Sequence, residues 1–327
     1  MFNCGKLVCF MLALLVTAWP ETEAAAQWKP DRNVEFIIGT GPGGVFDRTA
    51  RTIQQIWREN RMVTANTLVI NKPGAGQSLA QAYLNEKAGD GHYLSIASGI
   101  IFSNHLTGKS PYAYTDFTPL GILFSEATVF AVNAGSTVVS AAGLMDRLRK
   151  EPTGLSFAVG STLGSATHMA AAMVVKSAGG DVRRMKAVVL SSSGDSVIQV
   201  LGGHIDVVTS AATLVLPLAQ TGKLRIIAVA SPQRLKGLPG VPTWKEQGVD
   251  AVVTNWRGVI GPKGMSAEQI AYWEQVFART VASASWQAEI AKSFWEDTAM
   301  GSRDAKRFLD ADFALNKAVL TELGLVK

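Results

Sequence analysis

Short β-branched runs alternate with longer amphipathic segments along most of this chain, and few folds accommodate such an alternation. Val34 to Ile38 is a compact apolar run, and Asp47 to Glu59 follows it with Ala50, Ile53 and Trp57 at helical spacing. This order predicts a strand that leads into a helix. Repeated strand–helix units indicate a parallel α/β architecture. In the same part of the chain we expect strands at 67–70 and 93–97 and a helix at 78–87.

The alternation starts again near Thr128 and later gives way to helical patterns. We expect strands at 128–132, 155–159, 187–190, 206–209 and 225–230, and helices at 141–150, 165–178 and 193–201. After Asn255 the chain reads as mostly helical. Ser266 and Gln269 have the spacing of a capping box, and Asn316 is the one polar break in the apolar stripe of the last predicted helix.

The length of the chain and the restart together predict two domains. The sequence has 327 residues, more than one hydrophobic core usually supports, and no low-complexity linker divides it. We therefore predict a first lobe of residues 27–126 plus 255–327 and a second lobe of residues 127–254. The chain would cross between them near Glu126 and near Thr254, and two such crossings form a hinge beside a cleft.

The N-terminus has the order of a secretory signal peptide. Lys6 provides a positive start, Leu7 to Ala18 form an apolar run of about a dozen residues, and small residues lead up to Ala26. The run is shorter than the roughly 20 residues that span a membrane. We predict that residues 1–26 are removed near Ala26 and that the mature protein is periplasmic. The alternative is an uncleaved N-terminal anchor.

Cysteine content and charge exclude several classes of function. Cys4 and Cys9 both lie in the predicted signal peptide, so the mature chain would have no disulfide, thiolate nucleophile or thiolate metal site. Removing one lysine and two glutamates with that segment leaves 30 basic and 24 acidic residues. The basic residues are scattered, which predicts a mild attraction for anions and no nucleic-acid interface.

A glycine-rich loop follows the first predicted strand. Gly39 to Gly44 fits the pattern G-x-G-x-x-G, which taken alone suggests a dinucleotide site. Three observations oppose that interpretation. Asp47 would repel a pyrophosphate, the second strand ends at Asn71 without an acidic ribose partner, and the chain carries an export signal. What remains is a loop whose N–H groups, together with a helix dipole, can hold a carboxylate.

Similar loops occur at three more strand-to-helix junctions. They are Pro73 to Ser78, Gly160 to Ser165 and Ser191 to Gly194, all rich in Gly, Ser or Thr. Because ligands of open α/β folds bind at the carboxyl ends of the strands, the four loops predict one binding site shared by two lobes. The alternative is that the loops are ordinary helix caps, which is an equal prospect for Ser193 and Gly194.

Motifs for catalysis and metal binding are missing from the sequence. There is no G-x-S-x-G or H-E-x-x-H motif, and the four histidines have no metal-ligand spacing. We therefore predict no catalytic residue, no metal and no cofactor. His168 is the histidine expected near the cleft, although it could equally pair with the backbone. Asp47 is expected to cap its helix, the alternative being a place at the mouth of the site.

Taken in order, several segments of the chain resemble the Bug family, also called the TctC-like tricarboxylate-binding receptors. The matching segments are Pro42 to Asp47 with Ala50 and Arg51, Asn71 to Gly76, Asp90-Gly91, Gly164-Ser165 with His168, Gly203 with Asp206, Val241 to Gly248, Trp256 to Gly258 and Gly261 to Gly264. They extend over nearly the whole predicted mature chain. The resemblance implies a two-lobed type II periplasmic-binding-protein (flytrap) fold and delivery of ligand to the membrane permease subunits of a tripartite transporter.

The resemblance also implies where a ligand carboxylate binds, partly through water. The candidate ligand-binding residues are Gly43, Gly44, Val45, Phe46, Asp47, Gly74, Ala75, Gly76, Gln77, Ser78, Ser161, Thr162, Ser165, His168 and Ser192. Two departures from the family concern the far end of the ligand. Gly39 to Gly41 replace a Pro-Phe-Ala segment, and Leu190 to Gly194 replace a Pro-Tyr-x-Gly segment.

The function expected from this sequence is an extracytoplasmic receptor that acts as a monomer and binds a small carboxylate. Citrate-like tricarboxylates are the first expectation, followed by dicarboxylates and aromatic carboxylates. Two alternatives remain open. The chain could serve a membrane sensor instead of a permease, or it could be a periplasmic enzyme on the same fold, although no clustered acid/base pair supports the enzyme.

Overall fold

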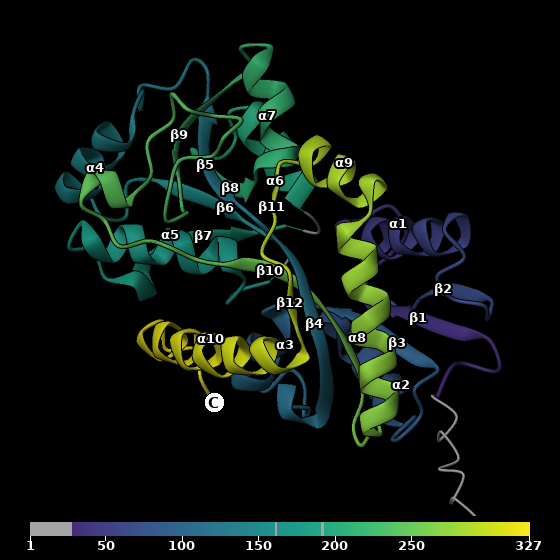
Figure 1. Ribbon diagram of the computed structural model, residues 1–327. Coiled ribbons are helices and arrows are strands. Elements are labelled where there is room, and N and C mark those ends of the chain that lie inside the picture. Colours follow the sequence, from purple (N-terminus) through teal and green to yellow (C-terminus); the bar gives the residue numbers. More distant parts are fainter. Residues whose placement is uncertain (1–27, 161, 191–192) are drawn as a thin grey trace, which may run out of the picture.

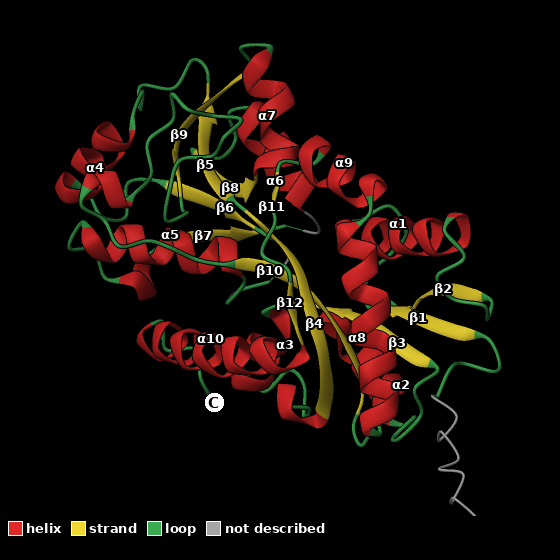
Figure 2. Ribbon diagram, viewed as in Figure 1, coloured by secondary structure: helices red, strands yellow, loops and turns green. Residues whose placement is uncertain are grey.

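The computed structural model describes residues 28–160, 162–190 and 193–327. Two β-sheets, each with helices on both faces, form two lobes that lie side by side (Figures 1 and 2). The helices are α1 (Val45–Glu59), α2 (Ser78–Asn85), α3 (Ile100–Leu106), α4 (Ala141–Lys150), α5 (Ala166–Ser177), α6 (Ser193–Leu201), α7 (Ala212–Gln220), α8 (Ala267–Ala282), α9 (Ala284–Lys292) and α10 (Ser302–Glu322). The predicted signal peptide, residues 1–26, lies outside the described residues.

The first sheet has the strand order β11-β4-β10-β3-β1-β2, with β12 also paired to β4. Its strands are β1 (Val34–Ile38), β2 (Thr67–Asn71), β3 (Tyr93–Ala97), β4 (Phe117–Glu126), β10 (Asn255–Pro262), β11 (Trp295–Glu296) and β12 (Met300–Gly301). β1, β2 and β3 are mutually parallel, whereas β10 is antiparallel to both β3 and β4. The sheet therefore combines residues from both ends of the chain.

The second sheet has the strand order β7-β6-β8-β5-β9. Its strands are β5 (Thr128–Asn133), β6 (Ser156–Val159), β7 (Lys186–Val189), β8 (Val207–Ala211) and β9 (Leu224–Val229). β6 pairs in parallel with β7 and β8, and β5 pairs antiparallel with β8 and β9. The parallel architecture that the strand–helix alternation predicted is thus only partly present, because β10 in one sheet and β5 in the other run antiparallel to both of their neighbours.

Side-chain alternation in the strands supplies a core on each face of the two sheets. Phe130 of β5 packs with α4 and α5, while its neighbours Val129 and Ala131 pack with α6 and α7 on the opposite face. In the first sheet, α1, α8 and α9 cover the face that contains Phe36, and α2, α3 and α10 cover the other. Each lobe is therefore a helix–sheet–helix sandwich.

Two short segments carry the chain between the lobes. β4 ends at Glu126 and β5 begins at Thr128, while the return passes through Thr254 into β10. Asn255 and Glu126 are paired in the antiparallel ladder of β4 and β10, so the two segments lie next to each other. Figure 1 shows β4 and β10 running together from one lobe toward the other. Any cavity between the lobes therefore opens beside this strand pair.

Strand β10 occupies a part of the chain that the sequence pattern presented as mostly helical. Its burial is continuous from Trp256 to Pro262, because neighbours lie on both edges and helices on both faces. Such a strand shows no polar alternation. β4, α3 and α7 likewise lack a clear periodic signal, whereas β1, β3 and α4 have the bounds that the pattern predicted.

Candidate functional site

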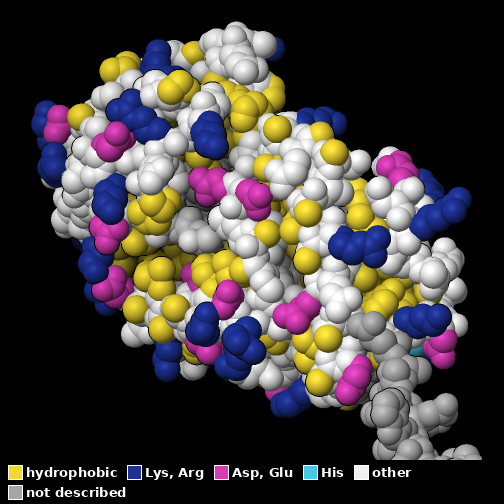
Figure 3. Space-filling model, in the orientation of Figure 1, with side chains coloured by type: hydrophobic (Ala, Val, Ile, Leu, Met, Phe, Trp, Pro, Cys, Tyr) yellow, Lys and Arg dark blue, Asp and Glu magenta, His cyan; other side chains and the backbone are white. Residues whose placement is uncertain are grey.

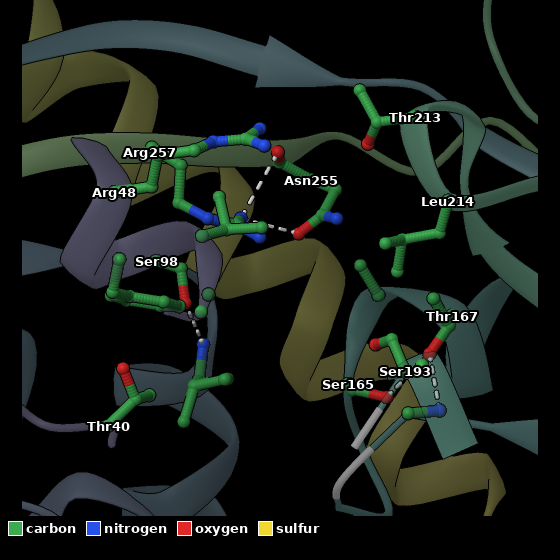
Figure 4. Close-up of a pocket in the computed structure, with 18 of the residues that line it drawn as sticks. Thr40, Arg48, Ser98, Ser165, Thr167, Ser193, Thr213, Leu214, Asn255 and Arg257 are labelled. Carbon is green, nitrogen blue, oxygen red and sulfur yellow. Dashed lines mark hydrogen bonds between the residues drawn. The ribbon is translucent and has the colours of Figure 1, made fainter. Parts of the chain in front are cut away.

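A cavity of about 620 Å³ lies between the two lobes. Its walls include residues one or two positions beyond the carboxyl ends of β1, β3, β6 and β8, which matches the usual position of ligands in open α/β sheets. The first lobe contributes the loop 40–46 and residues 98–100, and the second contributes 165–167, 193–194 and 213–214. Figure 4 shows Arg48, Asn255 and Arg257 on one side of the pocket and Thr213, Leu214, Ser165, Thr167 and Ser193 on the other.

Asp47 fixes the shape of the loop that enters α1. Its buried carboxylate accepts the N–H of Gly43 at 2.9 Å, the Nδ2 of Asn71 at 3.0 Å and the Nε of Arg51 at 2.9 Å. Gly43 has φ +83°, a conformation that glycine adopts without strain. Burial alone would raise the pKa of Asp47, but the hydrogen bonds from Arg51, Gly43 and Asn71 hold this pKa below its ordinary value. Asp47 therefore remains ionised, and its hydrogen bonds hold the loop in this conformation.

Three helices of both lobes begin at the cavity with backbone donors that their own helix cannot satisfy. The first turn of a helix has N–H groups without an intrahelical acceptor, and the helix dipole makes this end positive. Gly44 caps α1 and Ala211 caps α7, and neither supplies a side-chain capping bond. Ser165 caps α5 and accepts the His168 N–H at 3.3 Å. These helix starts are therefore suited to hold an anion.

Four buried side-chain atoms on the cavity wall have no hydrogen-bond partner within the described chain. They are Thr40 Oγ1, Thr213 Oγ1, Arg257 Nε and Asn316 Oδ1. Buried polar groups are normally paired, so each such atom calls for a partner that the chain does not provide. Arg257 Nε can only donate and Asn316 Oδ1 can only accept.

Arg257 is held rigidly at the junction of the two crossings. Its guanidinium pairs with the buried carboxylate of Glu126, and its Nη1 donates to Asn255 Oδ1 at 2.7 Å and to the Trp256 carbonyl at 2.9 Å. The guanidinium also lies over the ring of Phe46, 5.0 Å from the centroid. These contacts leave Nε as the free donor and link the strands that join the lobes to the loop that begins α1.

Arg48 is the second cation on the wall, and it is more exposed to solvent than Arg257. Its side chain is 48% exposed, donates to Ser293 Oγ at 3.3 Å and lies 3.8 Å from Glu289. In Figure 4 it lies beside Arg257. An exposed arginine on a flexible stem can move toward a ligand at little cost, whereas the buried Arg257 cannot.

Helix α10 adds an acidic side chain to the same cavity. Asp312 is 9% exposed, and its Oδ2 accepts the indole N–H of Trp256 at 2.7 Å. Burial raises the pKa of Asp312 to about 6, and the Trp256 hydrogen bond opposes that rise. Asn316 lies one turn further on and donates its Nδ2 to the Asp312 carbonyl oxygen at 2.7 Å.

Only some of the predicted site residues line this cavity. Gly43, Gly44, Val45, Phe46 and Ser165 do, and Asp47 lies directly behind them as the residue that shapes the loop. Their contact with a ligand remains a prediction. Ser161 and Ser192 lie outside the described residues.

The predicted second loop, Gly74 to Ser78, lies away from the cavity wall. It passes beside the start of the first loop, where the side chain of Gln77 is close enough to Gly39 to forbid a Cβ there. Gly76 accepts a hydrogen bond from Asn104 through its carbonyl oxygen. Gly74, Ala75, Gly76 and Gln77 all have positive φ, so the loop has an unusual and well-defined backbone.

Thr162 and His168 support the second-lobe loop from behind. His168 is buried, accepts the Gly164 N–H on Nδ1 at 2.9 Å, and has a pKa that burial lowers to about 4. It is therefore a neutral imidazole at physiological pH. Thr162 accepts Lys109 Nζ from the first lobe at 2.7 Å, which makes it a contact between lobes.

Sequence patterns indicated most of the remaining wall only weakly. Trp256 to Gly258 stood out as a motif, but nothing in the sequence indicated that Arg257 faces a cavity. Asn316 stood out only as a polar break in an apolar stripe. Arg48, Ser98, Thr213, Asn255 and Asp312 carried no signal, because their place on the wall depends on contacts between distant parts of the chain.

Some kinds of site are not found in the described part of the chain. No group of three or more His, Asp or Glu side chains is arranged to hold a metal ion across residues 28–160, 162–190 and 193–327. Over those same ranges, no helix combines the length and the apolar character needed to cross a membrane. On the face shown in Figure 3, basic and acidic side chains are interspersed.

Two sheets of mixed strand direction, a pair of crossings and a cavity between the lobes define a periplasmic-binding-protein fold. Residues 50–325 match the model of the tripartite tricarboxylate transporter family receptor, TctC. The chain belongs to this family, and it is therefore a solute-binding receptor and not an enzyme.

Individual relatives agree with this assignment. Protein BugT of Bordetella pertussis is 25% identical over 267 residues, covering 80% of each chain. A protein of R. palustris solved with adipate has a TM-score of 0.80 and 24% identity, with 91% of this chain and 99% of that chain covered. MatC from Rhodopseudomonas palustris, solved with bound malate, has a TM-score of 0.71 and 20% identity, with 90% and 97% covered. At these identities the two solved structures establish the shared fold.

Proposed function

We propose that this receptor captures a small carboxylate in the cavity between its lobes and delivers it to a tripartite membrane transporter. The observation that carries the proposal is the unpaired, buried Nε of Arg257, a residue that lines a cavity onto which three helix N-termini open. An unpaired donor and several positive helix ends favour an anion with planar oxygen acceptors. The adipate and malate named for two proteins of the same fold are carboxylates of suitable size.

The carboxylate would bind at the start of α1. Gly43 and Gly44 lie in the loop that Asp47 shapes, and the first-turn N–H groups of Val45 and Phe46 have no helical acceptor. Ser165 would contribute from the second lobe. Gly74 to Ser78, Thr162 and His168 would act indirectly, by holding the loops and the contact between lobes, while Ser161 and Ser192 remain predicted contacts.

Ligand capture would close the lobes about the two crossings. We assign residues 28–126 and 255–327 to one lobe and 127–254 to the other, because each set forms its own sheet. Arg257 and Glu126 lie where the crossings meet, so ligand bound to Arg257 is coupled to the hinge. Hinges of this kind are a few residues at the ends of elements.

The place of action follows from the family and the predicted signal peptide. The receptor would be exported, cut near Ala26 and active as a periplasmic monomer, with the permease subunits of the transporter as its partners. Mass spectrometry of the protein purified from the periplasm would test the cut, since the mature chain should begin at Gln27.

Calorimetric titration with a panel of mono-, di- and tricarboxylates tests the proposed function. We expect at least one carboxylate to bind with a dissociation constant in the micromolar range or below and to raise the midpoint of thermal unfolding. Amines, neutral sugars and phosphate serve as comparison ligands. If no carboxylate binds while one of those ligands does, the proposal is wrong.

A matched pair of glycine variants tests the position of the carboxylate. Gly43 and Gly179 have φ of +83° and +85°, and a Cβ on either would meet nothing within 4 Å. Alanine at each position should therefore cost a similar free energy of unfolding, about 1 kcal/mol. Only Gly43→Ala should weaken binding, by about tenfold or more. Equal affinities in the two variants would place the carboxylate elsewhere.

A further inference from the structure

Two residues of α10 place hydrogen-bond acceptors on the cavity wall, whereas the proposed anion site consists of hydrogen-bond donors. Asp312 and Asn316 lie one helical turn apart, so their side chains share a face of the helix. Asn316 is 2% exposed and Asp312 is 9% exposed, yet both line the cavity. Side chains of these types are seldom buried so deeply.

The orientation of the Asn316 amide is fixed by its neighbours. Its Nδ2 donates to the Asp312 carbonyl oxygen at 2.7 Å, and a flipped amide would place two oxygens against each other there. The Oδ1 atom must therefore point the other way, and it has no hydrogen-bond partner within the described chain. An amide oxygen in this position requires a donor.

The Asp312 carboxylate can also accept further hydrogen bonds. The Trp256 indole N–H bonds to one carboxylate oxygen, and the described residues supply no second hydrogen bond to this carboxylate. The nearby cations do not neutralise it, because Arg257 pairs with Glu126 and Arg48 lies closest to Glu289. A buried carboxylate with one neutral donor is poorly stabilised, and the raised pKa of about 6 reflects this burial.

We propose that Asp312 and Asn316 form a subsite for a hydrogen-bond donor, so that the cognate ligand is a carboxylate that also bears an ammonium or hydroxyl group. This inference rests on the proposed function, because it concerns the same cavity. One side of the cavity would bind the ligand carboxylate, and the other side would bind its hydrogen-bond donor. Arg257 Nε and the helix starts bind the carboxylate, and Asp312 and Asn316 bind the donor. A plain dicarboxylate would bring a second negative charge toward Asp312 and be disfavoured.

Matched ligands that differ only at the end remote from the carboxylate test this subsite. At chain lengths of four and six carbons we would compare four carboxylic acids by calorimetric titration. The carbon remote from the carboxylate would carry no substituent, a hydroxyl group, an amino group or a second carboxylate. At one length or the other, the amino or hydroxy acid should bind about ten- to a hundredfold more tightly than the unsubstituted acid. The diacid should bind more weakly than the donor-bearing acid.

The variant Asp312→Asn identifies the source of the preference, because it keeps an acceptor for Trp256 but removes the charge. We expect the preference for the acid with a terminal amino group over the unsubstituted acid to fall about tenfold, both affinities being measured on the same variant. Asp304→Asn, on an exposed turn of the same helix, is the control and should retain the full preference. Thermal unfolding of each variant confirms that it is folded.

The outcomes separate this inference from the proposed function. If carboxylates bind but the donor-bearing members have no advantage at either length, or Asp312→Asn leaves the advantage intact, the donor subsite is wrong and carboxylate capture stands. If none of the carboxylates binds, both proposals fail together.

Discussion

The two lobes line the same cavity with different chemistry. Among the described residues, every charged side chain on the wall, namely Arg48, Arg257 and Asp312, comes from the lobe built on the first sheet. The second lobe offers hydroxyl groups, helix starts and apolar contacts from Ser165, Thr167 and Thr213 with their neighbours. This difference indicates that the first lobe selects the charge pattern of a ligand, whereas the second lobe completes its enclosure. Substitutions in the two lobes should therefore differ in size and kind.

The largest expected effect belongs to the first lobe. Arg257→Met leaves Glu126, which is 3% exposed, as an unpaired buried charge. We expect a loss of about 3–5 kcal/mol in the free energy of unfolding, measured by urea denaturation. The double variant Glu126→Gln with Arg257→Met should lose clearly less, because no lone charge remains.

An exposed ion pair provides the comparison for that experiment. Arg149→Met breaks a surface contact with Asp146, in which both side chains are more than half exposed, and should change the free energy of unfolding by less than about 0.5 kcal/mol. If Arg257→Met costs no more than Arg149→Met, the buried pair contributes little and the comparison between lobes loses its main support.

The second effect in size has the opposite sign and depends on pH. The pKa of Asp312 is about 6 in the folded protein and near its ordinary value of 3.8 in the unfolded chain. The folded state therefore holds this proton more firmly, and ionisation costs folding free energy as pH rises from about 4 to 6. Without ligand, Asp312→Asn should be more stable than the parent by up to about 3 kcal/mol above pH 6. The gain should vanish below pH 4.

Urea denaturation at pH 4 and pH 7.5 measures this change, and Asp304→Asn controls for the loss of one exposed charge. The buried His168 titrates in the parent and in both variants, so its contribution cancels in the differences. A constant difference between Asp312→Asn and the parent at both pH values would contradict the raised pKa.

A smaller effect is expected where the first lobe shapes its loop. Asp47→Ala removes the acceptor that holds the Gly43 N–H and the Asn71 amide. We expect a loss of about 1–2 kcal/mol in the free energy of unfolding and a roughly tenfold weaker affinity for the tightest carboxylate of the panel. Unchanged affinity in a less stable protein would show that binding does not require this loop conformation.

The smallest effect is expected in the second lobe. Ser165→Ala removes the helix cap that accepts the His168 N–H and a hydroxyl that faces the cavity. The cap should be worth about 1 kcal/mol of unfolding free energy, and the affinity should fall by less than tenfold. Ser283→Ala removes the N-cap of α9, whose hydroxyl also donates to the Thr280 carbonyl oxygen, and should cost at least as much stability without any change in affinity. A larger affinity loss for Ser165→Ala than for Asp47→Ala would reverse the proposed order of the lobes.

Local patterns predicted the elements whose residues alternate cleanly between core and solvent. The bounds of β1, β3 and α4 agree with the predicted ranges, and the loop 39–44 was recognised from its glycines. The pattern failed at β10 because its residues are buried on both faces, as in the centre of any fully covered sheet. It also led us to expect parallel sheets, since strand direction depends on which strands pair and not on the residues of one strand.

The sequence by itself determined the alternation of strands and helices, the glycine and serine loops at their junctions, and the receptor family. Tertiary structure decided which of those loops reach the cavity and which charged side chains join them. Arg257 reaches the wall because β10 inserts between β3 and β4, and Asp312 does so because α10 returns to pack beside Trp256. Contacts between residues far apart in the sequence depend on how whole helices and strands pack, and a local pattern of residues therefore does not predict them.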